Sequence, residues 1–410
     1  MKKKRFPRYH FTAILSAILV VLGSHEDVMG RKKSDKDHPL IRAIISLPGR
    51  PSVMALSPDG MQLAVLHSEG LSLVNLNSQS VALSFPVPSR SILPNLFFAD
   101  EGSTLYFTNQ ENQIDRLDLG KNSSSPETWI SLAGGKTGGG GIRGMALSSS
   151  EHFVAIGVAR VDEVVVLDLA RKLAVRQIPG VKSPLGIVFS KDGRELLVGQ
   201  QCQEVRPENP PSSLLDKKES DCLDGTGYVS VIDLEQQTLK TEIEVGNHSG
   251  RFCISRDGSR LFIPGKDGKE ITAINVVTEE VAEEISLQSV RRGQASALPV
   301  TLSLDLDGKR LFAAMTDTPW IAVIALGSQS SKSLNVESSK LEGLIPVPGK
   351  PQAVALDLKG TKLLVALNEP VDWREAQPAT VQGPGAVAVI ELPKAKEWAM
   401  WLESYLKGSS

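Results

Sequence analysis

One sequence pattern recurs seven times between residues 51 and 392, and it restricts the chain to very few folds. Each copy has a short apolar segment, a turn and a second apolar segment, and then a loop and a third apolar segment that usually ends in Asp-Leu or a similar pair. The copies lie at residues 51–76, 94–119, 142–169, 184–234, 250–276, 299–326 and 351–392. A repeat this short cannot bury its own apolar face, so we expect neighbouring copies to stack against one another.

The residues at the turns and after the third segments indicate the kind of repeat. The turns contain Asp59-Gly60, Asp192-Gly193, Asp257-Gly258, Asp307-Gly308 and Lys359-Gly360, and such pairs accept the backbone angles of a tight hairpin. A fourth apolar segment follows six copies, at residues 81–87, 128–132, 174–179, 239–245, 281–287 and 341–347. Four short antiparallel strands repeated seven times predict an all-β, seven-bladed β-propeller over residues 40–393.

The two ends of the repeat array indicate how the ring closes. The seventh copy stops at its third strand, residues 386–392, whereas a spare strand of the fourth type, residues 41–48, precedes the first copy. We expect the N-terminal strand to complete the last blade, which would leave no open sheet edge. Residues 394–410 place apolar side chains at near-helical spacing, and we expect a helix and tail that cap the outside of the ring.

Residues 1–30 have the organisation of an export signal. Five basic residues and no acid lie among the first ten residues, the apolar residues 11–23 follow, and polar sequence resumes at Ser24. Candidate cleavage points follow Gly23 and Gly30, and an uncleaved N-terminal anchor is the alternative. We therefore expect the protein in the periplasm or at the cell surface, with membrane contact only through this segment if it is retained.

The cysteines and the charge balance add two expectations. In an oxidising compartment Cys202 and Cys222 form a candidate disulfide, which would stabilise the fold by roughly 3 kcal/mol, and the alternative is that both stay reduced. Cys253 lies in an apolar strand pattern, and we expect a buried free thiol there. With 45 Lys and Arg against 47 Asp and Glu, the chain lacks the basic excess of a nucleic-acid binder.

Three copies resemble a known bacterial repeat. Residues 51–65, 184–198 and 351–365 are similar to the forty-residue YVTN-type propeller repeat, whose core runs P-x-x-V-A-x-S-P-D-G-x-x-L-Y-V-A-N, and residues 103–109 (STLYFTN) keep its second strand. The resemblance extends over residues 40–392. Proteins of this kind include surface-layer proteins, lactonase-like propellers, amine dehydrogenase heavy chains and phosphoesterases with an additional catalytic domain. The resemblance therefore implies a fold and leaves binding and enzymatic functions open.

Insertions between the strands indicate the working face of the ring. Four long loops lie at residues 134–141, 201–226, 288–297 and 369–384. They join either a fourth strand to the next first strand or a second strand to a third strand, and in an up-and-down blade both connections emerge on one face. We name this the insertion face, and the side with the Asp-Gly turns the hairpin face. Because propellers vary their loops on rigid blades, we expect binding at the insertion face.

Histidine, arginine and tryptophan side chains near these loops are the candidate binding residues. They are His67, Arg143, His248, Arg251, Arg291, Arg292, Trp320 and Trp373. A funnel rich in Arg and flanked by Trp would hold a small anionic or carbonyl-bearing ligand, or grip a partner protein. The alternative is that the arginines are solvated and the tryptophans pack between blades.

Catalytic and metal motifs are missing from the sequence. There is no H-x-x-x-H or H-E-x-x-H pair, no G-x-S-x-G elbow, and the glycines at 138–141 lack the Lys-Ser/Thr of a phosphate loop. We therefore expect no metal and no cofactor. Asp168, Asp233 and Glu391 share one repeat position, which predicts a role in hydrogen bonding within the blades.

The sequence thus predicts an exported propeller that binds a protein or ligand in the cell envelope, with an envelope or extracellular protein as its expected partner. The alternative is a propeller enzyme of lactonase or dehydrogenase-subunit type. Its site would lie in the central funnel of the same face, where Asp317, Glu369 and His67 would converge. No catalytic residue is assigned.

Overall fold

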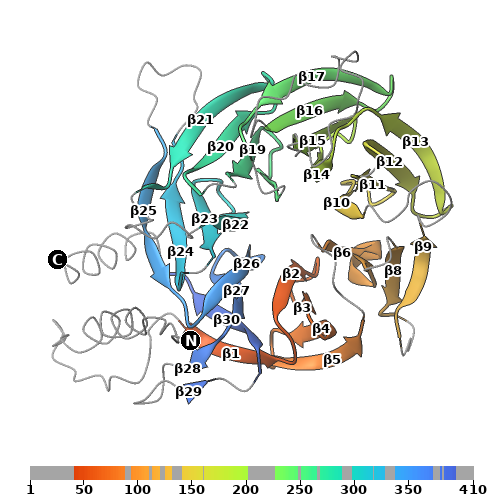
Figure 1. The fold of residues 1–410 in the computed structure, drawn as a ribbon. Coiled ribbons are helices and arrows are strands. Elements are labelled where there is room, and N and C mark those ends of the chain that lie inside the picture. Colours follow the sequence, from red (N-terminus) through yellow and green to blue (C-terminus); the bar gives the residue numbers. More distant parts are fainter. Residues whose placement is uncertain are drawn as a thin grey trace, which may run out of the picture.

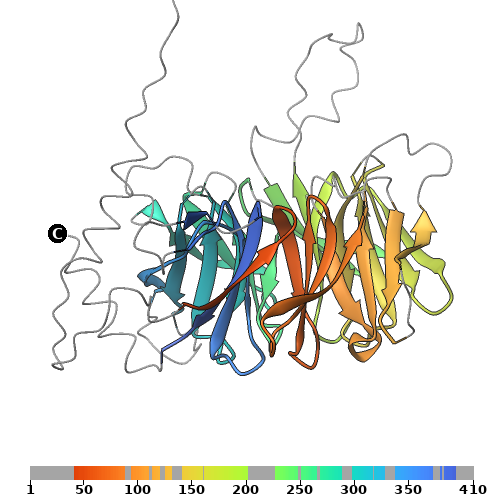
Figure 2. The same cartoon turned by 90° about the horizontal axis from the view of Figure 1, so that it is seen from below.

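The strands of the computed structural model form seven four-stranded antiparallel sheets arranged in a ring (Figures 1 and 2). The predicted all-β, seven-bladed propeller is therefore confirmed. The structure describes residues 41–87, 94–109, 113–120, 125–131, 141–159, 161–201, 227–247, 251–265, 268–288, 298–316, 318–327, 338–372, 379–380 and 383–393. The described part of the chain contains no helix with the length and hydropathy needed to cross a bilayer.

The blades follow one another along the chain, with each first strand at the centre of the ring and each fourth strand at the rim (Figure 1). Blades 1 and 2 are β2 (Pro51–Leu56), β3 (Gln62–His67), β4 (Gly70–Asn75), β5 (Ser80–Pro86), and β6 (Leu96–Ala99), β7 (Thr104–Thr108), β8 (Gln113–Asp118), β9 (Glu127–Ser131). Blades 3 and 4 are β10 (Ile142–Leu147), β11 (Phe153–Val158), β12 (Glu163–Asp168), β13 (Leu173–Pro179), and β14 (Pro184–Phe189), β15 (Glu195–Gln201), β16 (Gly227–Asp233), β17 (Thr238–Glu244).

The remaining three blades have the same layout. Blades 5 and 6 are β18 (Cys253–Ile254), β19 (Arg260–Pro264), β20 (Glu270–Asn275), β21 (Glu280–Ser286), and β22 (Pro299–Leu304), β23 (Arg310–Met315), β24 (Trp320–Ala325), β25 (Lys340–Pro346). Blade 7 is β26 (Lys350–Leu356), β27 (Lys362–Asn368), β30 (Gly385–Glu391) and β1 (Ile41–Leu47). A short ribbon, β28 (Val371–Asp372) and β29 (Ala379–Thr380), lies between β27 and β30, and a 3-10 turn, η1 (Asp100–Gly102), follows β6.

The ring closes between the two ends of the propeller sequence. Strand β1 pairs antiparallel with β30, so that Leu47 lies opposite Gly385 and Ile45 opposite Val387. The N-terminal strand therefore supplies the fourth strand of blade 7, as the sequence predicts. Because the first and last segments of the propeller share one sheet, the blade cannot form until both are present, and no first or last blade is left with an open face.

The hairpin-face turns of blades 1, 4 and 5 share one hydrogen-bond pattern. In blade 1 the Ser57 hydroxyl donates to Asp59 Oδ1 (2.5 Å), the same carboxylate oxygen accepts the N–H of Met61 (2.9 Å), and Gly60 has a φ of +70°. Ser255 and Asp257 repeat the pattern in blade 5, where the Ser255 hydroxyl is the main cause that lowers the pKa of Asp257 to about 2. The predicted Asp-Gly turns are therefore built by local side-chain to backbone bonds.

These turns also contact one another around the ring. A Cβ atom on Gly60 would lie 2.9 Å from Leu358 Cδ1 of blade 7, and one on Gly360 would lie 3.1 Å from Leu306 Cδ1 of blade 6. The turn glycine thus provides the backbone angle and also leaves room for the neighbouring turn.

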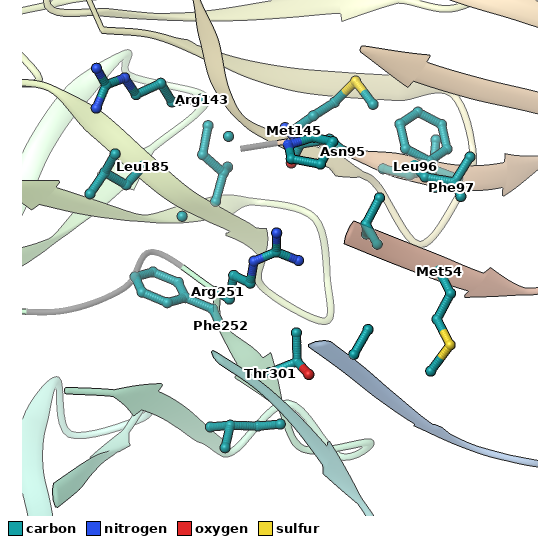
Figure 3. Close-up of a pocket in the computed structure, with 18 of the residues that line it drawn as sticks. Met54, Asn95, Leu96, Phe97, Arg143, Met145, Leu185, Arg251, Phe252 and Thr301 are labelled. Atoms are coloured by element: carbon teal, nitrogen blue, oxygen red, sulfur yellow. The ribbon is translucent and has the colours of Figure 1, made fainter. Parts of the chain in front are cut away.

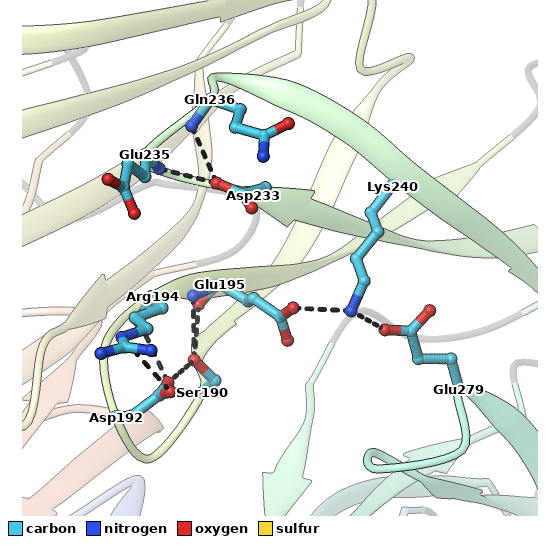
Figure 4. A network of polar contacts seen from close by, with 9 residues as sticks. All are labelled: Ser190, Asp192, Arg194, Glu195, Asp233, Glu235, Gln236, Lys240 and Glu279. Carbon is cyan, nitrogen blue, oxygen red and sulfur yellow. Dashed lines mark hydrogen bonds and ion pairs between the residues drawn. The ribbon is translucent and has the colours of Figure 1, made fainter.

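The ends of the third strands confirm the predicted hydrogen bonding within the blades at all three positions. Asp233 accepts the N–H groups of Glu235 and Gln236, both at 2.8 Å (Figure 4). Asp168 accepts the N–H of Arg171 (2.9 Å). Glu391 accepts a charge-assisted hydrogen bond from the Arg42 guanidinium of β1, the strand that closes the ring within the same blade.

The core consists of apolar side chains packed between neighbouring blades. Phe312 and Val323 of blade 6, for example, pack with Leu363 and Val365 of blade 7 in one fully buried cluster. Full burial of a side chain of this size stabilises a fold by about 1.5–3 kcal/mol. At the rim, Lys240 of blade 4 bridges Glu195 of its own blade (2.8 Å) and Glu279 of blade 5 (Figure 4).

Cys253 in β18 is a free thiol, as predicted, and is partly buried. Burial raises the pKa of this thiol to about 12, so the protonated form persists at neutral pH and the sulfur is a poor nucleophile. Cys202 and Cys222 lie outside the described residues, and their disulfide stays a prediction.

Candidate functional site

The strand register shows which strand ends share a face. In blade 4, Pro184 at the start of β14 pairs with Gln200, Gln201 at the end of β15 pairs with Gly227, and Tyr228 pairs with Glu244 near the end of β17. The loops that follow second and fourth strands therefore leave the blade at one end, and the Asp-Gly turns lie at the other. The strands that flank all four long insertions end on this insertion face.

A cavity of about 300 Å³ lies in the central channel, towards the insertion-face ends of the first strands. All seven blades contribute to it. One repeat position lines it in every blade, and the residues at this position are Val53, Asn95, Gly144, Gly186, Arg251, Thr301 and Ala353. The position that follows is apolar throughout, with Met54, Leu96, Met145, Ile187, Phe252, Leu302 and Val354. The walls are therefore mainly apolar, with few polar groups (Figure 3).

Arg251 is the single charged residue among the seven equivalent positions. Its guanidinium extends from just before β18 towards the middle of the channel (Figure 3). Burial lowers the pKa of Arg251, because the apolar surroundings disfavour the charged guanidinium. No Asp or Glu lines the cavity, and no described carboxylate lies within ion-pair distance of Arg251. An anionic group entering the channel would supply the missing counter-charge.

Arg143 also lines the cavity, one repeat position earlier in blade 3. In Figure 3 its guanidinium extends away from Arg251, on the side where Leu185 of blade 4 lies. Two of the predicted arginines thus contribute to one cavity; Arg251 precedes its first strand, whereas Arg143 is the second residue of β10.

His67 is buried inside blade 1 and does not line the cavity. Its Nδ1 accepts the N–H of Glu69 (3.2 Å), so Nε2 carries the proton and donates to the Ser72 hydroxyl (2.8 Å). Burial lowers the pKa of His67 to about 4. The imidazole is therefore neutral at physiological pH.

Two other blades fill the same slot with amides. Asn109 in blade 2 donates to the Asp115 carboxylate (3.0 Å), and Gln200 in blade 4 donates to Ser230 and Glu242. The three residues occupy equivalent positions at the ends of their second strands. A polar side chain here thus bonds to the third strand, and this internal bond accounts for His67 without any ligand.

Of the other predicted residues, only Trp320 lies among the described residues. Trp320 begins β24, is partly buried between Met315 and Pro346, and does not line the cavity. His248, Arg291, Arg292 and Trp373 lie outside the described residues, as do residues 394–410. Asn95 and Thr301 line the channel but escaped the sequence analysis. Aligning the seven copies on their turns would have found them, since both share the position of Arg251.

The enzymatic alternative requires carboxylates and a histidine around the channel. The described residues that line the cavity include no Asp, Glu or His. Glu369 is half-exposed and pairs with Lys350 (2.8 Å), while Asp317 lies outside the described residues. Among the described residues, no group of three or more His, Cys, Asp and Glu could hold a metal ion.

Comparison with known proteins supports the fold. No family model and no curated protein matches the chain. The β-propeller domain of Cps50 (Swd1) from Myceliophteria thermophila is 12% identical, with a TM-score of 0.62, and the match covers 86% of this chain and 99% of that domain. Hydrazine synthase from Kuenenia stuttgartiensis is 16% identical over 85% of this chain and 99% of that chain, with a TM-score of 0.59.

A chain of the mitotic checkpoint complex is 14% identical, with a TM-score of 0.57, and the match covers 90% of this chain and 98% of that one. The similar structures thus include a chain from a multiprotein complex and one from an enzyme. At these identities the likeness establishes the propeller fold, which commonly serves as a scaffold for protein interactions, and the function depends on the site.

Proposed function

We propose that this protein is an exported propeller of the YVTN-repeat type that acts as a binding scaffold in the cell envelope. It engages an anionic group, on a partner protein or a small ligand, at the insertion-face mouth of its channel. One observation carries the proposal: Arg251 occupies a ring of otherwise uncharged positions, in a cavity whose described lining has no acid. Arg143 adds a second guanidinium, and the apolar walls favour a ligand with an apolar body.

The channel site is tested with small anionic probes. Isothermal titration of the mature protein with glutarate and with inorganic phosphate should show saturable binding, and Arg251→Gln should weaken it by at least tenfold because a charge-assisted bond is lost. Arg194→Gln is the matched control, since Arg194 is exposed and lies near Asp192 on the hairpin face. Equal binding by the wild type and Arg251→Gln would sink the proposal.

A photo-crosslinking residue separates a protein partner from a small ligand. Gln352 is the third residue of β26, near the insertion face, and Met61 is exposed on the hairpin face. We expect a crosslinker at position 352 to trap a protein in intact cells, one at position 61 to trap none, and Arg251→Gln to abolish the product. Anion binding without a crosslink would assign the channel to a small ligand instead.

Export is proposed from the residues that precede the propeller. Alkaline phosphatase fused after residue 410 should be active in cells, and the purified protein should begin at residue 24 or 31. A Cys202–Cys222 bond should lower its mass by two hydrogens. An inactive fusion would contradict export, and a chain that retains residue 1 would indicate an N-terminal anchor.

A further inference from the structure

Blade 2 departs from the other six blades at one buried position of the third strand. The residue two places before the strand's end is aliphatic and buried in six blades, where it is Leu73, Val166, Val231, Ala273, Val323 and Val389. Blade 2 has Arg116 there. A charged side chain at a position that otherwise packs between blades needs a physical reason, since six copies show that an aliphatic residue satisfies the fold.

Arg116 lines a second cavity, of about 520 Å³, between blades 2 and 3. Tyr106 and Trp129 of blade 2 line it with Arg116, and blade 3 contributes His152, Phe153 and the turn at residues 168–172. The lining shares no residue with the central channel. This interblade cavity is therefore a separate site.

Three hydrogen-bond donors in the interblade cavity have no acceptor among the described residues. Arg116 Nε is buried without a partner, and its terminal nitrogens lie 3.5 Å from Asp118 and 3.8 Å from Glu127. The Tyr106 hydroxyl and the Trp129 indole N–H bond to no described residue, although these side chains are only 4% and 5% exposed.

The three donors lie close together. Tyr106 is the cross-strand neighbour of Arg116, and its ring meets that of Trp129 edge to face at 5.1 Å. Tyr and Trp usually find a hydrogen-bond partner when buried, and the polar atoms of Tyr106 and Trp129 keep accessible surface, unlike Arg116 Nε. A ligand that brings oxygen acceptors would satisfy the Tyr106 and Trp129 donors and bond to the terminal nitrogens of Arg116.

The charges around the interblade cavity argue against an ionic ligand. Its lining carries three cations and three carboxylates, namely Arg116, Arg171, Lys172, Asp100, Glu151 and Asp168. Asp118 and Glu127 lie beside Arg116 and remove any positive excess. The Asp100 carboxylate has no ion-pair partner among the described residues, so it is available to accept hydrogen bonds.

We propose that the interblade cavity binds a neutral, polyhydroxylated ligand, a saccharide of one or two rings. Each sugar hydroxyl both accepts and donates a hydrogen bond. Hydroxyl oxygens therefore accept from Arg116, Tyr106 and Trp129, while hydroxyl protons are donated to the carboxylate of Asp100 or Glu151. The apolar edges of Trp129 and Phe153 pack against the C–H surface of the ring. This activity goes beyond the anion site of the central channel and does not depend on it.

The test is isothermal titration of the mature protein with maltose, cellobiose and N,N′-diacetylchitobiose as neutral probes, and with glucuronate and glucosamine as charged ones. We expect at least one neutral disaccharide to bind. Arg116→Leu, which introduces the residue that blade 1 has at this position, should weaken that binding at least tenfold. Tyr106→Phe removes only the hydroxyl and should weaken it about fivefold. Because both variants are tested, a folding defect in one of them still leaves the other as a test of the site.

Two controls isolate the site. Tyr228→Phe removes a hydroxyl in blade 4, away from the interblade cavity, and should leave the affinity unchanged. Arg251→Gln should also bind the disaccharide normally, so the two proposals fail independently. The proposal is overturned if none of the neutral disaccharides binds, if Arg116→Leu and Tyr106→Phe both bind like the wild type, or if a charged probe binds where the neutral ones do not.

Discussion

Blade 3 packs tightly against blade 4 and loosely against blade 2. Towards blade 4, a Cβ atom on Gly144 would lie 2.6 Å from the Leu185 carbonyl oxygen, and one on Gly157 would lie 2.9 Å from Pro184 Cβ. Towards blade 2, the same sheet leaves a cavity of about 520 Å³ beside Phe153. Blades 2 and 4 have the same strand order, yet blade 4 approaches blade 3 much more closely than blade 2 does.

The difference shows that a few side chains, and not the blade architecture, determine how closely two blades pack. Glycine at two positions brings the backbones of blades 3 and 4 together, where dispersion contacts are dense. Arg116, Tyr106 and Trp129 line the cavity at the hairpin-face end of blade 3, while Tyr106 and Trp129 also pack against Val154 and Ile156 of that blade. The repeated fold can therefore form a binding cavity at one interface without change elsewhere in the ring.

The largest expected effect comes from disrupting the tight interface. Gly144→Val places three carbon atoms where no Cβ fits, and we expect the free energy of unfolding to fall by about 3 kcal/mol. Gly193→Ala is the control, because Gly193 has a φ of +70° and no atom within 4 Å, so only backbone strain of about 1 kcal/mol applies. Urea denaturation measures both. Equal losses for the two variants would mean that the blade 3–4 contact is not tight in solution.

The second prediction concerns His67, whose position at the end of the second strand also holds a polar side chain in blades 2 and 4. His67 has a pKa of about 4 when folded, against an ordinary value of 6.5, so its contribution to stability is complete above pH 6.5 and is lost as the pH falls towards 4. Between pH 7.5 and 4.5 we expect the wild type to lose about 2.5 kcal/mol more than His67→Gln. The variant should fold, since Gln200 fills the equivalent slot of blade 4. Urea denaturation measures both proteins. An equal loss of the free energy of unfolding in the wild type and the variant would rule out His67 as the titrating group.

The smallest effect is expected at the loose interface. Arg116→Leu replaces a partly buried cation by an aliphatic side chain that can fill part of the cavity, and we expect the free energy of unfolding to rise by about 1 kcal/mol. Arg171→Leu, at an exposed position on the edge of the same cavity, should change it by less than about 0.5 kcal/mol. Thermal and urea denaturation check both, and destabilisation by Arg116→Leu would make Arg116 a structural residue.

Comparison between the blades also explains why Arg143 and Arg251 line the channel whereas His67 does not. Arg143 and Arg251 were predicted from their place near the starts of first strands, and both line the channel because every first strand begins there. His67 also lies at the insertion end of a strand, but its side chain turns into the blade and bonds to Ser72. The sequence shows at which end of a strand a residue lies. The direction of its side chain, next to a bulge or turn, depends on how the neighbouring strands pair.

The interblade cavity could not be predicted from the sequence. Arg116 stands out once the third strands are aligned, yet nothing in the sequence shows that Tyr106 and Trp129 lie beside it with unpaired polar groups. That arrangement needs the pairing of β7, β8 and β9 and the distance to blade 3, which belong to the assembled ring.

By itself, the sequence determined the seven blades, the turns and the closing strand. These follow from local rules: alternating apolar residues form strands, Asp-Gly pairs form turns, and an unpaired strand at one end completes an incomplete sheet at the other. Tertiary structure alone decided which polar side chains face the channel, which are bonded inside a blade and where two blades leave a cavity. Those outcomes depend on packing between residues far apart in the chain, where differences of a few tenths of an ångström separate a close contact from an open site.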